Sequence, residues 1–154
     1  MTPSGGGRRR APRTKHAAKH ASTNGIEGET SERFQRGMRA FREIAGRKVE
    51  EAFDPLAGIA PNFSRYAMAF FGDVYTRPGL DRRSRQIATI SALMALGTAP
   101  SQLRFHIEAG LNVGLTREQI VEVITQLALY VGAPAAGNAF AAAADVFASR
   151  PGKK

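Results

Sequence analysis

The chain has 154 residues, no cysteine and a formal net charge of +9 at neutral pH. This length suits one compact domain with its own hydrophobic core. The lack of cysteine excludes disulfides, thiolate nucleophiles, cysteine-ligated metals and thiol redox chemistry. The excess positive charge is concentrated at the ends: six positive and two negative charges lie in 1–29, 13 and 11 in 30–149, and three positive in 150–154.

The basic segment 1–29 is rich in Gly, Ser, Thr, Ala, Lys and Arg and has few large apolar residues. Such a composition does not bury enough surface to offset the entropy of ordering, so 1–29 is predicted to be a disordered tail and 150–154 a disordered C-terminus around a folded domain over 30–149. The tail leaves one alternative open, a contact with nucleic acid through its arginines and lysines. No run of about 18 apolar residues and no secretory signal is present, which predicts a cytoplasmic protein without a membrane partner.

Within the domain, apolar residues recur at helical spacing and no stretch alternates like a half-buried strand. The predicted fold class is therefore all-α, a compact bundle of about six helices. The expected helices, in chain order, cover about 31–51, an aromatic stripe over 63–74, a segment capped by Asp81 and ended by Gly97, 100–113, a segment with a capping box at Thr116 and Gln119 that ends near Val131, and 134–149.

Two packing expectations follow from the C-terminal half. The fourth and fifth helices are joined by only "GLT", which predicts an antiparallel hairpin. The last helix is rich in alanine and has little side-chain bulk on any side, so other helices are expected to cross it closely, including helices of another subunit.

His106 is the only histidine outside the tail. It follows Leu103 by three residues and precedes Ile107, so helical geometry turns it toward the packed side of the fourth helix. Two interpretations stand side by side: a hydrogen-bonded core residue, or the group that transfers protons near neutral pH.

Arginines crowd the start of the third helix, where backbone N–H groups favour an anion. Arg82 and Arg83 are expected on a solvated surface, whereas Arg85 adjoins the buried side and is a candidate for holding a carboxylate. Gln86 donates or accepts hydrogen bonds but is no base at neutral pH, and Tyr75 offers a hydroxyl. No metal-ligand set and no nucleotide motif are recognised.

Three motifs occur together in a characteristic order: "YTRPGLDRRSR", then a histidine followed by "GLNVGLTREQI", then "YVGAPAA". Over about 31–148 the chain resembles the carboxymuconolactone decarboxylase family, within the alkylhydroperoxidase D-like superfamily. The resemblance implies an all-helical subunit in homotrimers or homohexamers that needs no cofactor. It also implies a carboxy-lyase of aromatic compound catabolism, which converts 4-carboxymuconolactone to 3-oxoadipate enol-lactone and CO2 in the protocatechuate branch.

The chain departs from related sequences at several positions. In the peroxidase branch a CxxC pair precedes the histidine, and those positions here are Ala99 and Gln102, so thiol peroxidase activity is not expected. Gln86 stands where a glutamate often follows the arginine. Gly137 stands where the decarboxylase branch tends to have asparagine.

By resemblance, the substrate is a small anionic lactone and His106 donates a proton to carbon. Arg85, helped by Arg77, would hold a carboxylate, and Gln86 or Tyr75 would bond the lactone oxygen. Two alternatives remain: a family homologue acting on another small carboxylated or lactone substrate, and a non-catalytic oligomeric binding protein.

Overall fold

The computed structural model describes residues 23–46 and 59–150, and within these ranges the secondary structure is helical, without strands. The all-α prediction is confirmed. The helices are α1 (Thr23–Ala45), α3 (Pro61–Tyr75), α4 (Arg82–Leu96), α5 (Pro100–Asn112), α6 (Arg117–Val131) and α7 (Ala133–Ser149).

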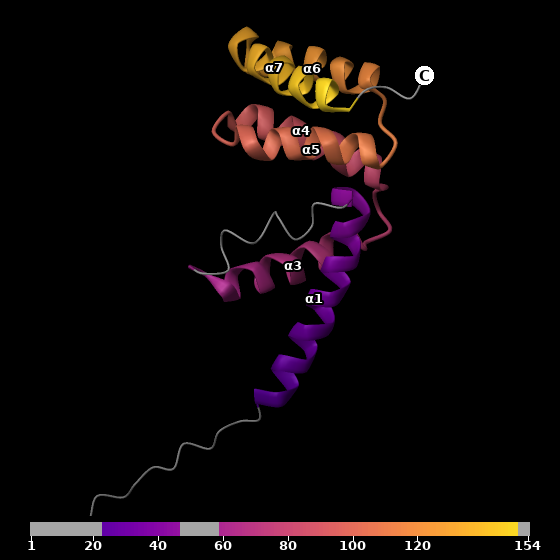
Figure 1. Ribbon diagram of the computed structural model, residues 1–154, viewed down its shortest axis with the longest axis vertical. Helices are drawn as coiled ribbons and strands as arrows, with labels where there is room; N and C mark the ends of the chain where they lie inside the picture. The colour runs from indigo at the N-terminus through magenta and orange to yellow at the C-terminus, as the bar shows by residue number, and fades with distance from the viewer. Residues whose placement is uncertain (1–22, 47–58, 151–154) are drawn as a thin grey trace, which may run out of the picture.

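The helices form three stacked pairs (Figure 1). Helix α1 crosses α3, α4 lies beside α5, and α6 lies beside α7 on the far side of the α4–α5 pair. The predicted α5–α6 hairpin is wrong, because α5 packs mainly against α4 and α7, and α6 mainly against α7 and α4. The alanine-rich α7 explains this arrangement: Ala136, Ala139 and Ala143 are buried, which lets its neighbours approach closely.

The helix boundaries follow local signals. The Asp81 carboxylate caps α4 by accepting a hydrogen bond from the Ser84 N–H at 3.0 Å. Gly97 ends the same helix in the left-handed conformation, at φ 69°. Thr116 and Gln119 form the reciprocal capping box at the start of α6. These predicted caps are confirmed.

Helix α1 differs from its prediction at both ends. It begins at Thr23, so it includes 23–29, which the composition predicts to be part of the tail. Residues 1–22 and 151–154 lie outside the described residues. It ends at Ala45 rather than near residue 51, because Gly46 has a positive φ of 64°. Asn112 of α5 donates a hydrogen bond to the Ile44 carbonyl at 2.7 Å and so satisfies a carbonyl that the helix end leaves open.

The crossing of α1 and α3 depends on two glycines. A Cβ at Gly72 would lie 2.6 Å from the Gly37 nitrogen, and a Cβ at Gly37 would overlap the Met68 carbonyl. The two backbones therefore touch directly. Asp73, which accepts hydrogen bonds from Arg33 and Arg36, ties the same helices together at the edge of the crossing.

Helix α5 belongs to two hydrophobic clusters. One side contributes Leu103 and Ile107 to the core shared by α4, α6 and α7. The other side contributes Ala109 and Phe105 to the cluster built by α1 and α3, where the Phe105 ring stacks on Phe41 at 5.5 Å. His106 lies between these two sides, at the seam where the clusters meet.

Candidate active site

Tyr75, Gln86 and His106 form a chain of hydrogen bonds drawn from three helices. His106 Nδ1 lies 2.9 Å from Gln86 Oε1, and Gln86 Nε2 lies 3.4 Å from the Tyr75 hydroxyl. The end of α3, the first turns of α4 and the middle of α5 supply these groups. Three residues predicted from the sequence as site residues are thus brought into contact.

The arrangement fixes the tautomer of His106. The Gln86 oxygen accepts only, so Nδ1 must carry the proton and donate it. Burial lowers the pKa of His106 from 6.5 to about 4, so the ring is neutral at neutral pH. Nε2 then holds a lone pair, and it has no hydrogen-bond partner among the described residues.

Gln86 is the most deeply buried polar side chain in the described part of the chain, with no solvent exposure. A buried amide is stable only when it is hydrogen-bonded, and the Tyr75 and His106 side chains meet this need. Gly110 leaves room beside it, since a Cβ there would lie 3.9 Å from the Gln86 Cβ and 3.0 Å from Leu115 Cδ1. The Phe105 ring lies edge-on to the imidazole, with centroids 5.1 Å apart.

The Arg85 side chain donates hydrogen bonds to the loop between α3 and α4. Its Nε donates to the Leu80 carbonyl at 3.1 Å and its Nη2 to the Arg77 carbonyl at 3.0 Å. The guanidinium also lies over the Tyr75 ring, 5.6 Å from its centroid. The structure thus joins Arg85 to the site through Tyr75, whereas Arg77 contributes its backbone and is exposed.

Sequence reasoning placed Gln86 against substrate and missed its bond to His106. A signal was available: Gln86, Ile90 and Met94 follow one another at spacings of four residues and are the buried residues of α4. The register of that stripe puts Gln86 in the core. A buried amide on α4 and a histidine on the packed side of α5 are then natural partners.

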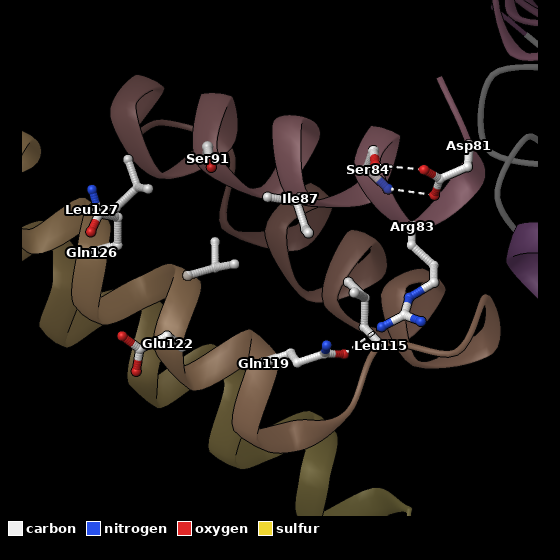
Figure 2. A pocket seen from close by; sticks show the side chains of 11 residues that line it. Asp81, Arg83, Ser84, Ile87, Ser91, Leu115, Gln119, Glu122, Gln126 and Leu127 are labelled. Carbon is white, nitrogen blue, oxygen red and sulfur yellow. Dashed lines mark hydrogen bonds between the residues drawn. The ribbon is translucent and has the colours of Figure 1, made fainter. Parts of the chain in front are cut away.

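The two described cavities lie elsewhere. A groove of about 870 Å³ runs between α4 and α6 (Figure 2), and a second cavity of about 490 Å³ lies where α4, α5 and α7 meet. Neither is lined by Tyr75, Gln86 or His106. Within 23–46 and 59–150, no three acidic or histidine side chains gather as a metal site would require, and none of the described helices has the length and hydrophobicity to cross a bilayer.

Comparisons with known proteins bear on the chain as a whole. The sequence profile of the carboxymuconolactone decarboxylase family matches residues 61–145, which include the three hydrogen-bonded site residues. The chain is 35% identical over 118 residues to a 4-carboxymuconolactone decarboxylase of Acinetobacter baylyi, covering 75% of this chain and 87% of that protein.

Two further relatives match over fewer residues. An uncharacterised 15.0 kDa protein of Paracoccus denitrificans is 36% identical over 80 residues, 51% of this chain and 60% of that protein. A nitrosuccinic acid decarboxylase of Metarhizium robertsii is 28% identical over 106 residues, 66% of this chain and 71% of that protein. From the profile match and the Acinetobacter relative, the chain belongs to the carboxymuconolactone decarboxylase family.

Proposed function

We propose that the protein is a cofactor-independent decarboxylase that converts 4-carboxymuconolactone to 3-oxoadipate enol-lactone and CO2 in protocatechuate catabolism. Similarity to decarboxylases supports the reaction class. The observation that carries the proposal is the hydrogen bond from His106 Nδ1 to the buried Gln86 oxygen, because it fixes a neutral imidazole with its second nitrogen available.

The substrate supplies its own electron sink. When the bond to the carboxylate beside the ring oxygen breaks, CO2 leaves and the electron pair moves through the ring double bond to the lactone carbonyl. The resulting enolate takes one proton on the carbon next to that carbonyl. A dianion and one proton thus become a monoanion and CO2, and the protein must bind charge, exclude water and deliver the proton.

His106 delivers this proton from Nε2. The free protein holds the imidazole neutral, so the site must first take up a proton from solvent. An anionic substrate beside the ring favours the imidazolium form, because an opposite charge nearby raises the pKa of a histidine. Gln86 keeps the ring in one orientation through both steps, since its oxygen accepts from Nδ1 in either protonation state.

Arg85 is the proposed carboxylate ligand. Two of its five N–H donors are used by backbone carbonyls, which leaves donors for an anion and fixes the guanidinium beside Tyr75. Arg77 supplies further positive charge from the same loop. The Tyr75 hydroxyl is proposed to bond the lactone oxygen, since it already accepts from Gln86 and so has its proton to donate.

The experiment that tests the function compares the natural protein with His106→Asn. The asparagine amide can reproduce the Nδ1 donor to Gln86 while removing Nε2. Turnover of 4-carboxymuconolactone, followed by CO2 release, is expected to fall by about 100-fold or more with the melting temperature largely kept. Undiminished turnover in a folded variant would return His106 to a structural role, and no turnover in either protein would contradict the assigned substrate.

A second candidate keeps the chemistry and changes the substrate. The relative from Metarhizium robertsii is named for nitrosuccinic acid, a different small carboxylic acid. In this chain the buried position beside the histidine is the amide Gln86. A panel of small acids with an electron sink next to the leaving carboxylate separates the candidates, because the true substrate gives the highest kcat/KM and loses it in His106→Asn.

A further inference from the structure

The imidazole of His106 is held through one nitrogen and leaves the other available. Nδ1 lies 2.9 Å from the Gln86 oxygen, and the Tyr75 hydroxyl lies 3.4 Å from the nitrogen of the same amide. An amide oxygen only accepts hydrogen bonds, so Nδ1 carries the proton of the ring and Nε2 carries the lone pair. His106 is half-buried, whereas Gln86 has no solvent exposure. At rest, Nε2 is therefore a base rather than an acid.

The surroundings of the ring favour this resting form. Burial lowers the pKa of His106 to about 4, and the amide of Gln86 brings no negative charge to stabilise a second proton on the ring. The proposed decarboxylation needs Nε2 to take up a proton before it can deliver one. Abstraction of a proton from carbon needs no such preparation, because the lone pair is already present. The same nitrogen is thus ready for a reaction that begins with deprotonation.

The enolate of the proposed decarboxylation can be reached by a second route. Loss of CO2 leaves an electron pair that spreads through the ring double bond to the lactone carbonyl. A lactone with hydrogen in place of the leaving carboxylate gives the same enolate when that carbon loses a proton, because the electron pair of the C–H bond follows the same path. Both routes arrive at an imidazolium beside one enolate, and the step that follows is identical.

We propose that the site also isomerises such lactones by moving the ring double bond. Nε2 of His106 takes the proton from the carbon beside the ring oxygen, and the electron pair of that C–H bond forms the new double bond. The pair of the old double bond moves to the lactone carbonyl as the enolate forms. The same nitrogen then returns a proton to the carbon next to the carbonyl. No atom is gained or lost and no electron acceptor is needed. This activity rests on the proposed function, since it requires the lactone ring to bind at His106.

Such a lactone keeps the carboxylate by which the site would hold it. 4-Carboxymuconolactone has two carboxylates, one that leaves and one that remains on a side arm. Arg85 is fixed by two backbone carbonyls and has N–H donors left for an anion. Holding the carboxylate that remains does not oppose the reaction, whereas holding the departing one would stabilise the charge that must move. Muconolactone, which has hydrogen where the leaving carboxylate would be, is therefore the probe.

The test incubates the full-length protein with muconolactone and, separately, with 4-carboxymuconolactone, both in D2O, and follows the products by NMR. We expect muconolactone to form the enol-lactone faster than it does without protein. Deuterium should enter the methylene next to the carbonyl in both reactions. Because one nitrogen delivers it in each case, the deuterium should have the same configuration in the two products, analysed early in the reaction.

Two variants show whether His106 is the base. His106→Asn is expected to lower the isomerisation rate by about 100-fold or more. Thr125→Asn, which introduces the same side chain at an exposed position of α6, should leave the rate unchanged. Circular dichroism checks that both variants are folded. Isomerisation that persists in His106→Asn, or opposite configurations of deuterium in the two products, would overturn the inference.

The two substrates separate this inference from the proposed function. Release of CO2 from 4-carboxymuconolactone without isomerisation of muconolactone would overturn the inference and leave the proposed function standing. Isomerisation that depends on His106, without release of CO2, would support the inference and contradict the proposed substrate. Absence of both reactions would overturn both.

Discussion

At the scale of single residues, burial lowers the pKa of His106, and the neutral amide at position 86 adds no charge beside the ring. Replacing Gln86 with Glu puts a carboxylate 2.9 Å from Nδ1 in place of a neutral oxygen. The opposite charge favours the imidazolium form, so the pKa of His106 is expected to rise by about 1 to 3. Titration of the imidazole by NMR measures this change. Tyr75→Phe alters the same chain without adding charge, so its His106 pKa should stay near that of the natural protein.

The buried imidazole also links stability to pH. The pKa of His106 is 6.5 in an unfolded chain and about 4 in the fold, so between these values the unfolded state binds a proton that the native state does not. The contribution of His106 to the free energy of unfolding is fully present above pH 6.5. It declines as the pH falls toward 4, by on the order of 3 kcal/mol.

Urea unfolding between pH 4 and 7 checks this linkage against His106→Asn, which does not titrate there. The pH dependence of the unfolding free energy should be shallower in the variant. The pKa of Asp73 is lowered by hydrogen bonds from Arg33 and Arg36, and that of Asp81 by hydrogen bonds from Ser84. The stability that these two carboxylates contribute is lost mainly below the pH range of the experiment, and it is the same in both proteins. Parallel curves would mean that His106 is not the source of the effect.

The residues of the candidate site were chosen from the sequence alone, but the hydrogen bonds between them could not be predicted from it. Periodicity turned His106 toward the core, and Tyr75, Gln86 and Arg85 were recognised by their chemistry. The partners depend on how α3, α4 and α5 meet in space, across 11 and 20 residues of chain. Arg85 is an example of a contact that the sequence does not reveal. Its hydrogen bonds to the Leu80 and Arg77 carbonyls depend on the conformation of a loop, which has no periodic pattern to read.

At the scale of the helices, the α1–α3 crossing is the contact most sensitive to a single methyl group. Gly72→Ala would drive a Cβ to 2.6 Å from backbone atoms of α1, which cannot move aside as a flexible side chain would. We expect a loss of about 3 kcal/mol. Gly137→Ala on α7 is the control, because nothing lies within 4 Å of its Cβ position. That variant should gain about 0.5–1 kcal/mol from helix propensity. Equal stabilities by urea unfolding would show that the backbones do not touch.

Helix existence was predicted better than helix contacts, for a physical reason. Helix caps act within one turn, so they can be predicted from neighbouring residues in the sequence. This holds for the caps at Asp81 and Thr116 and for the helix end at Gly97. The pairing of α5 with α4 rather than with α6 depends on the close approach that α7 permits. Gly46 shows the same limit, because a glycine inside a periodic stretch ends α1 through its positive φ, which periodicity does not reveal.

At the scale of the whole molecule, the two hydrophobic clusters need not melt together. The α1–α3 unit meets the other helices chiefly through α5, whereas α4 to α7 share a larger core. A unit with a smaller core that meets the other helices chiefly through one helix opens first, in local unfolding that hydrogen exchange detects. Amide protons of α1 and α3 are therefore expected to exchange faster than those of α5 and α7, and uniform protection would contradict this order.

This division has a consequence for heat inactivation. Tyr75 is the last residue of α3, so each opening of the α1–α3 unit withdraws its hydroxyl from Gln86 and leaves a buried amide short of a partner, while most helices remain intact. On warming, catalysis should then fail before helical circular dichroism does. The midpoint of heat inactivation is therefore expected several degrees below the midpoint of helix unfolding.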